Sequence, residues 1–255
     1  SILRAIIQKK ISKKIYILEK SKKNISKNKK INSNLKFLNK VDKNVASINF
    51  VILCAPMSEY EKIILKLNNF LSPHTLLTDV GSTKKNLLKL KNKKLNKKFN
   101  WIMSHPISGS EVSGPEYGSK NLFKKKWCII IKDKNKKALL KISKFWKKIG
   151  SKIVFMQSDE HDKIFSMTSH LPHLIAYNLI KTAQDFQKKN KKNIIKFSAG
   201  GLRDFSRTAA SNEIMWRDVF FTNKINMIKV IEMFIKNLKR LKKNIKFSKD
   251  KKLIK

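Results

Sequence analysis

The segment 104–111, with the sequence SHPISGSE, combines residue types that can transfer a proton. His105 ends a predicted strand, and the proline after it restricts the backbone at this point. An imidazole changes its charge near neutral pH, which suits general acid or base chemistry. A lone histidine is more often structural, but the glycine- and serine-rich loop around this one favours neither helix nor strand. We therefore predict a catalytic role for His105.

A second segment, 79–84 with the sequence DVGSTK, joins a predicted strand to a predicted helix. Such a junction places backbone N–H groups and the Ser82 hydroxyl at the carboxyl edge of a parallel sheet, where α/β proteins bind ligands. The alternative is an ordinary turn, with Gly81 in a left-handed conformation and Ser82 capping the helix. The residue types fit both interpretations.

Glu19 ends an earlier predicted strand with the sequence IYILE. In a dinucleotide-binding fold, an acidic residue at this position accepts hydrogen bonds from the ribose hydroxyls and repels a 2′-phosphate, which favours NAD over NADP. The alternative is an ordinary solvated glutamate, and the neighbouring Lys20 weakens the preference for NAD.

A histidine pair lies in the segment 168–173, with the sequence TSHLPH. His170 and His173 are three residues apart on one helix face, and with His161 they could bind a metal. No cysteine or paired carboxylate completes such a set, and Pro172 marks a helix start or kink. We therefore expect no metal site and interpret the pair as polar residues that face a cleft.

The chain has only five arginines, and three of them lie within fifteen residues of one another: Arg203, Arg207 and Arg217. Lysine supplies almost every other positive charge. A guanidinium binds a carboxylate through two parallel hydrogen bonds, which an ammonium cannot do, so these positions require a particular geometry as well as charge. The alternative is a set of structural ion pairs with Asp204 and Asp218.

The elements that position these residues follow an α/β pattern in the first part of the chain. Short apolar runs predict strands at 15–19, 50–55, 76–80, 101–105, 127–131 and 153–156. Amphipathic stretches predict helices at 59–71, 84–90 and 136–149. Strands that are apolar throughout are typical of a parallel sheet covered on both faces. The fold class we predict is therefore α/β, with a doubly wound, Rossmann-type, mostly parallel sheet.

The pattern changes at Ser158, after which long helices replace strands. Ser158 is a suitable N-cap, and a second long helix can start after Ser211 with an apolar stripe along its later half. That stripe needs a partner, either within its own domain or in an identical chain. We predict a dinucleotide-binding domain over residues 1–157 and an all-α dimerisation domain over residues 158–255.

The net charge of +42, from 59 basic and 17 acidic residues, raises the alternative of a nucleic-acid-binding protein. Its lysines are dispersed over every segment and do not form a stripe, so we expect no specific nucleic-acid partner. No run of 18 apolar residues and no signal-peptide pattern occurs. Cys54 and Cys128 lie in apolar runs and lack metal-ligand spacing, which predicts buried thiols in a soluble, cytoplasmic protein without a membrane partner.

Together, the DVGSTK, SHPISGSE, SHLPH, GGLRDFSR and MWRD segments resemble the prephenate dehydrogenase family, including its arogenate and cyclohexadienyl dehydrogenase members. The resemblance covers essentially the whole chain. It implies a homodimer that uses NAD for the oxidative decarboxylation of prephenate in tyrosine biosynthesis, with L-arogenate as the alternative substrate. A 3-hydroxyacid dehydrogenase is a rival, but it would leave the SHP loop unexplained.

The resemblance also implies residue roles. His105 is the catalytic base, and Ser82 orients it. The expected substrate-site residues are Glu111, His173, Arg203, Arg207 and Trp216. The expected cofactor-site residues are Glu19, Ala55, Pro56 and Ser82.

One departure from the family lies at the front of the chain. The family begins with a strand and a G-x-G-x-x-G turn that receives the pyrophosphate, whereas this chain begins at Ser1 with what we interpret as the following helix. No glycine precedes Gly81. The sequence is therefore either a fragment or a protein without the usual cofactor turn. We expect a protein that starts at Ser1 to have a poorly stable first half, to bind NAD weakly or not at all and to be catalytically silent, whereas its helical half should still fold and dimerise.

Overall fold

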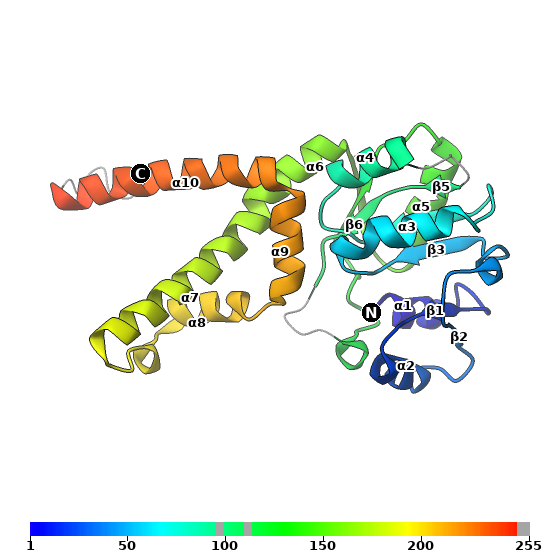
Figure 1. Cartoon of the computed structure of the whole chain (residues 1–255), viewed down its shortest axis with the longest axis horizontal. Helices are drawn as coiled ribbons and strands as arrows, with labels where there is room; N and C mark the ends of the chain where they lie inside the picture. Colours follow the sequence, from blue (N-terminus) through cyan, green and yellow to red (C-terminus); the bar gives the residue numbers. More distant parts are fainter. Residues whose placement is uncertain (95–98, 110–113, 249–255) are drawn as a thin grey trace. The chain divides into compact units, whose positions relative to one another are not determined.

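A computed structural model describes residues 1–94, 99–109 and 114–248 of the chain (Figure 1). The chain folds into two compact units. The first contains Ser1–His161 and Ser211–Asp218, and the second contains Asp162–Ala210 and the chain from Val219 onward. We predicted a boundary at residues 157 and 158. The division between the compact units falls after His161, and the first unit also includes Ser211–Asp218 from the helical half. The predicted domain boundary stays a prediction.

The first unit contains parallel strands in two groups. One group pairs β1 (Tyr16–Leu18) with β2 (Lys36–Leu38). The other has the order β3 (Phe50–Leu53), β4 (Leu76–Asp79) and β5 (Asn100–Trp101). Among the strands that the structure describes, no ladder joins β1 to β3. In the strand order of a doubly wound fold, β1 and β3 correspond to the two strands on either side of the strand that comes first in that fold.

A third group of strands contains β6 (Ser104–Pro106), β7 (Trp127–Ile131) and β8 (Lys152–Met156). β7 and β8 are parallel, whereas β6 runs antiparallel to β7. Backbone hydrogen bonds continue between the groups, because the N–H of Ile102 donates to Leu77 and that of Ile131 donates to Met103. The mostly parallel α/β sheet is thus confirmed, although the strand expected at 101–105 is divided into β5 and β6.

Helices α1 (Ile2–Gln8), α2 (Lys22–Lys29), α3 (Tyr60–Asn68), α4 (Lys85–Lys94) and α5 (Lys136–Lys148) complete this unit. Short 3-10 turns occupy Lys43–Val45, Met57–Glu59 and Pro115–Tyr117. The core forms where α5 packs on β7. Asn135 accepts a hydrogen bond from the Ala138 N–H and so caps α5, whose buried face continues through Ile142 and Trp146. This face packs with the buried Cys128 and Ile130.

Cys54 corrects one expectation, because it is exposed whereas Cys128 is buried. The apolar run 50–55 ends as a strand at Leu53. Cys54 therefore lies beyond the strand, at the carboxyl edge of the sheet, and not in the core.

The helical half contains α6 (Ser158–Phe165), a π-helical turn (Ser166–His170), α7 (Leu171–Asn190), a 3-10 turn (Ile195–Phe197), α8 (Gly200–Ala209), α9 (Glu213–Thr222) and α10 (Lys224–Lys246). Within the second unit, α8 runs alongside α7 (Figure 1). Leu171 on α7 forms a core with Met227 and Val230 on α10. The long helix expected after Ser211 is broken at Asn223, which ends α9 and precedes α10.

Candidate active site

The predicted cofactor residues follow the carboxyl ends of parallel strands. Leu53 and Asp79, the last residues of β3 and β4, are in register. Ala55 and Pro56 therefore leave the sheet at the same edge as Ser82. All three positions are at least partly exposed, so a ligand can reach them. This is the edge at which α/β proteins bind their ligands.

Glu19 follows β1 and is half-buried. Its carboxylate accepts hydrogen bonds from the Ser21 N–H at 2.9 Å and the Asn24 amide at 3.3 Å, both at the start of α2. These bonds fix the carboxylate at the strand end and use only part of its acceptor capacity. A carboxylate held at this position can also accept hydrogen bonds from ribose hydroxyls. The residues at the sheet edge therefore fit a nicotinamide dinucleotide.

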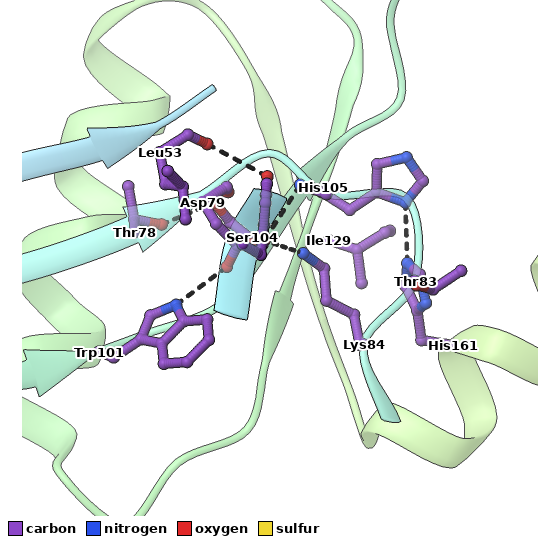
Figure 2. A network of polar contacts seen from close by, with 12 residues as sticks. Leu53, Thr78, Asp79, Thr83, Lys84, Trp101, Ser104, His105, Ile129 and His161 are labelled. Atoms are coloured by element: carbon purple, nitrogen blue, oxygen red, sulfur yellow. Dashed lines mark hydrogen bonds and ion pairs between the residues drawn. The ribbon is translucent and has the colours of Figure 1, made fainter. Parts of the chain in front are cut away.

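A buried ion pair lies directly behind the edge. Asp79 and Lys84 are both 0% exposed, and the Lys84 ammonium donates to the Asp79 carboxylate. The carboxylate also accepts hydrogen bonds from the Gly81 N–H at 3.0 Å and the Trp101 indole at 3.1 Å (Figure 2). The turn from β4 to α4 is thus fixed at both ends by one carboxylate.

A side chain at position 81 would be crowded, although the Gly81 backbone is not left-handed. Its φ is not positive, and a Cβ placed on it would lie 2.5 Å from the Met57 sulfur. The alternative of a left-handed turn at Gly81 is therefore wrong. Glycine at this position allows the turn to pack closely against Met57 and Tyr60.

Ser104 connects this network to the next strand. Its hydroxyl donates to the Asp79 carbonyl oxygen at 2.7 Å and lies 2.8 Å from the Thr78 hydroxyl. The Trp146 indole N–H donates to the same Ser104 oxygen at 2.9 Å. Ser104 is fully buried, so these partners replace water and fix the start of β6.

His105 follows Ser104 and is half-buried. Its backbone is held opposite Ile129 in the ladder between β6 and β7. Its ring Nδ1 lies 2.8 Å from Nε2 of His161, a fully buried residue of α6 (Figure 2). The ring centroids are 5.0 Å apart, at an interplanar angle of 60°. An imidazole so oriented can act as a general base through its other nitrogen.

Ser82 lies on the same edge, but no hydrogen bond between Ser82 and His105 occurs among the described residues. The His105 ring is instead hydrogen-bonded to the ring of His161, which we had considered only as a metal ligand. One signal was available, because His161 is four residues before Phe165 and shares its helix face. Both residues are buried.

Trp216 and Asp218 belong to the segment of α9 that is part of the first unit. Trp216 is buried. Asp218 is also buried and accepts hydrogen bonds from the Ser58 N–H at 3.0 Å and from Arg217 at 2.7 Å. Burial alone would raise the pKa of Asp218, but the hydrogen bonds from Ser58 and Arg217 outweigh it and lower the pKa. The structural pairing considered for Arg217 is thus present.

The second unit carries three of the predicted substrate residues. His173 on α7 is half-buried, and its Nδ1 lies 2.9 Å from the Ser169 carbonyl oxygen, so Nδ1 carries the hydrogen and donates. Burial lowers the pKa of His173, and the hydrogen bond to Ser169 partly opposes this shift. The ring is therefore neutral at pH 7, and its Nε2 is a hydrogen-bond acceptor.

Arg203 and Arg207 lie one turn apart on α8, and both are exposed. Arg203 lines a cavity of about 270 Å³, together with Ile180 and Gln184 of α7. Arg207 lies 3.8 Å from Asp204, with side-chain exposures of 68% and 79%. Two guanidinium groups on an exposed face suit recognition of a dicarboxylate.

A π-helical turn immediately precedes α7. Pro172 has no N–H and its ring crowds the preceding turn, so a wider turn before it relieves the conflict. The Asn223 amide donates to the Asp162 carbonyl oxygen at 2.8 Å and lies 3.2 Å from Nδ1 of His170. His170 is therefore a buried packing residue, unlike His173.

Glu111 lies outside the described residues, so its predicted role stays a prediction. Within the described ranges, no group of three or more histidine, cysteine, aspartate or glutamate residues could hold a metal ion. In the same ranges, no helix combines the length and apolar character needed to cross a membrane.

Two family models together match almost the whole chain. Residues 3–155 match "Prephenate dehydrogenase, nucleotide-binding domain", and residues 157–255 match "Prephenate dehydrogenase, dimerization domain". The chain is 32% identical over 200 residues to a cyclohexadienyl dehydrogenase of Zymomonas mobilis, which covers 78% of this chain and 68% of that protein. It is 29% identical to a prephenate dehydrogenase of Lactococcus lactis over 77% of this chain, and this alignment spans only 54% of the relative.

A solved structure supports the same relationship. Prephenate dehydrogenase from Aquifex aeolicus, in complex with hydroxyphenyl propionate and NAD+, superposes with a TM-score of 0.90 at 34% identity. The match covers 99% of this chain and 88% of that one. The Rossmann-type sheet and the helical second half are thereby confirmed. The chain belongs to the prephenate dehydrogenase family.

Proposed function

We propose that the chain catalyses the NAD-dependent oxidative decarboxylation of prephenate to 4-hydroxyphenylpyruvate, with His105 as the general base. The observation that carries this proposal is the His105 ring on β6, which is hydrogen-bonded through Nδ1 to His161. A bound nicotinamide dinucleotide supplies the hydride acceptor. The protein contributes orientation, charge and a group that takes up a proton.

The residues divide this task. His105 accepts the proton of the 4-hydroxyl as hydride leaves C4, and a carbonyl forms at that carbon. The bond from C1 to the ring carboxylate then breaks, CO2 leaves, and its electron pair restores aromaticity. The proton returns from His105 to the phenolic oxygen, so the reaction consumes no net proton. We assign Ser82, at the same edge, to contacts with the cofactor and the base.

The substrate carries two carboxylates, one on the ring and one on the side chain. We assign Arg203 and Arg207 to these carboxylates, and His173, Glu111 and Trp216 stay predicted substrate residues. The net charge of +42 favours the dianionic prephenate over L-arogenate, whose ammonium group cancels one negative charge. Glu19 favours NAD over NADP. A second copy of the chain would cover the exposed apolar residues of α10, which include Ile228, Ile235 and Leu238.

The kinetic tests use the chain preceded by a strand and a G-x-G-x-x-G turn, because we expect the chain that starts at Ser1 to bind NAD weakly or not at all. The first of these tests compares four reactions: prephenate or L-arogenate, each with NAD or NADP. We expect the fastest formation of reduced cofactor and CO2 from prephenate with NAD. Equal or faster turnover of L-arogenate would replace the proposed substrate. No turnover with any pair, despite binding of both ligands, would reject the proposed activity.

A further inference from the structure

The hydrogen bond between His105 and His161 limits where protons can sit. The two nitrogens are 2.8 Å apart, and only one hydrogen fits between them. One neutral ring must therefore donate and the other must accept. A metal between them is a poor alternative, because two nitrogens that bind tetrahedral zinc at about 2.0–2.1 Å would be roughly 3.3 Å apart.

The direction of this bond decides whether His105 can be a base. If His161 donates, Nδ1 of His105 holds the lone pair, and its Nε2 already carries the hydrogen. That tautomer cannot accept a substrate proton at Nε2. If His161 accepts, His105 keeps its hydrogen on Nδ1, and Nε2 presents the lone pair. In Figure 2, this second nitrogen of His105 points away from His161 and from the polar network.

Both rings are held on regular elements. His161 is 0% exposed, and its N–H donates to the Gln157 carbonyl oxygen at 3.0 Å within the first turn of α6. Its ring packs edge to face against His105. The backbone of His105 is held by its register with Ile129. The contact between the rings therefore follows from packing rather than from two mobile side chains meeting at a surface.

We propose that His161 is a positioning residue that accepts a hydrogen bond from Nδ1 of His105 and so fixes its Nε2 as the proton acceptor. This inference rests on the base role proposed above for His105. When Nε2 takes up the substrate proton, the Nδ1–H of the imidazolium remains directed at a neutral acceptor. That bond stabilises the charged ring in a partly buried site.

The first test measures the tautomers directly and needs neither cofactor nor turnover. The full chain is labelled with 15N-histidine, and long-range 1H–15N spectra are recorded at about pH 8, where unperturbed rings are neutral. The chain has only five histidines, and a His105→Asn variant assigns the signal of His105. We expect His105 to carry its hydrogen on Nδ1. A hydrogen on Nε2 would overturn the proposal.

The second test removes the acceptor. In His161→Leu, the His105 signals should change toward the Nε2–H tautomer. The kcat with prephenate should fall about 10–100-fold while KM changes less than about twofold. His161→Gln keeps an acceptor oxygen, so its kcat should be about tenfold higher than that of His161→Leu. His74→Leu, at an exposed histidine of the same unit, is the control and should leave kcat unchanged.

The outcomes separate this inference from the function on which it rests. An unchanged kcat in His161→Leu, together with an inactive His105→Asn, overturns the role of His161 alone. An active His105→Asn overturns the base role itself. If the leucine variant fails to fold, the tautomer of His105 in the unsubstituted chain and the kcat of His161→Gln still decide. A folded His161→Gln variant whose kcat is at or below about one hundredth of the parental value would contradict rescue by an acceptor.

Discussion

Two groups of residues differ in how completely the protein itself holds them. One is the buried polar network around Asp79, beside the sheet edge, and the other is the pair of arginines on α8. Asp79, Lys84 and Ser104 are 0% exposed, and each has its polar groups paired. Arg203 and Arg207 lie on an exposed helix face, and the contact of Arg207 with Asp204 at 3.8 Å joins two exposed side chains. The first set is organised before any ligand binds, whereas the second can be ordered by the ligand that it recognises.

This difference predicts different consequences of substitution. Changes at the buried set should reduce the stability of the first unit, because they leave a charge or a polar group without its partner. Changes at the arginines should reduce substrate affinity and leave the fold intact. The following predictions test this division, beginning with the largest effect.

The largest effect on stability is expected at Lys84. Lys84→Met leaves the Asp79 carboxylate buried without its cation, and we expect the free energy of unfolding to fall by about 3–5 kcal/mol. Urea denaturation measures the change. The matched control is Lys85→Met, because Lys85 pairs with Asp159 at side-chain exposures of 46% and 69%. The control should change stability by less than about 0.5 kcal/mol. Equal effects of the two substitutions would show that burial of the pair is unimportant.

Arg207→Lys tests the exposed set. The charge is kept but the two-pronged hydrogen bonding is lost, so binding of prephenate should weaken by about 1.5–3 kcal/mol, with no change in melting temperature. Calorimetric titration gives the affinity. Arg240→Lys, on α10, is the control for a general preference for arginine. If Arg207→Lys binds prephenate as tightly as the parent chain, Arg207 is not a carboxylate anchor.

Asp218 tests an intermediate case, since a buried carboxylate there pairs with a half-exposed Arg217. The folded-state pKa of Asp218 is lowered, so its contribution to stability is present above the unfolded pKa of about 3.9 and is lost as pH falls through the folded value. Asp218→Asn should therefore destabilise the chain by about 1–2 kcal/mol at pH 7. The difference should shrink below about pH 4. A difference that is constant from pH 7 to pH 3 would contradict this assignment.

The smallest effect is expected at Glu19. Glu19→Gln removes the negative charge but keeps an acceptor for the Ser21 N–H, so the turn after β1 should survive. We expect the preference for NAD over NADP, measured as a ratio of kcat/KM, to fall about tenfold, or about 1.4 kcal/mol. An unchanged ratio would remove Glu19 from the ribose site and leave it as a residue that orders the start of α2.

Much of this site could be predicted from sequence because it lies where apolar runs end. Ser82 follows β4, at the edge where parallel strands end, and His105 lies on a short strand whose end is marked by proline, serine and glycine. The break at Asn223 was not predicted, since its cause is a set of hydrogen bonds to Asp162 and His170, more than fifty residues away. The hydrophobic periodicity of a local segment does not indicate such distant hydrogen-bond partners.

Two other features were missed for related reasons. Lys84 reads as one more solvated lysine in a lysine-rich chain, and only the fold shows that Asp79 receives its ammonium in the core. His161 reads as a polar residue of a first helical turn, and its contact with His105 joins elements 56 residues apart. Both depend on tertiary pairing, which a single sequence pattern does not report.

The most direct test of the central claim is the kinetic effect of His105→Asn, measured beside the binding of prephenate to the same variant. Asparagine is similar in size but cannot take up the substrate proton. A general base in a site organised before binding predicts that kcat falls by about 10²–10⁴ while the dissociation constant for prephenate changes less than about threefold. A variant that keeps the parental kcat and loses only affinity would contradict the base role of His105.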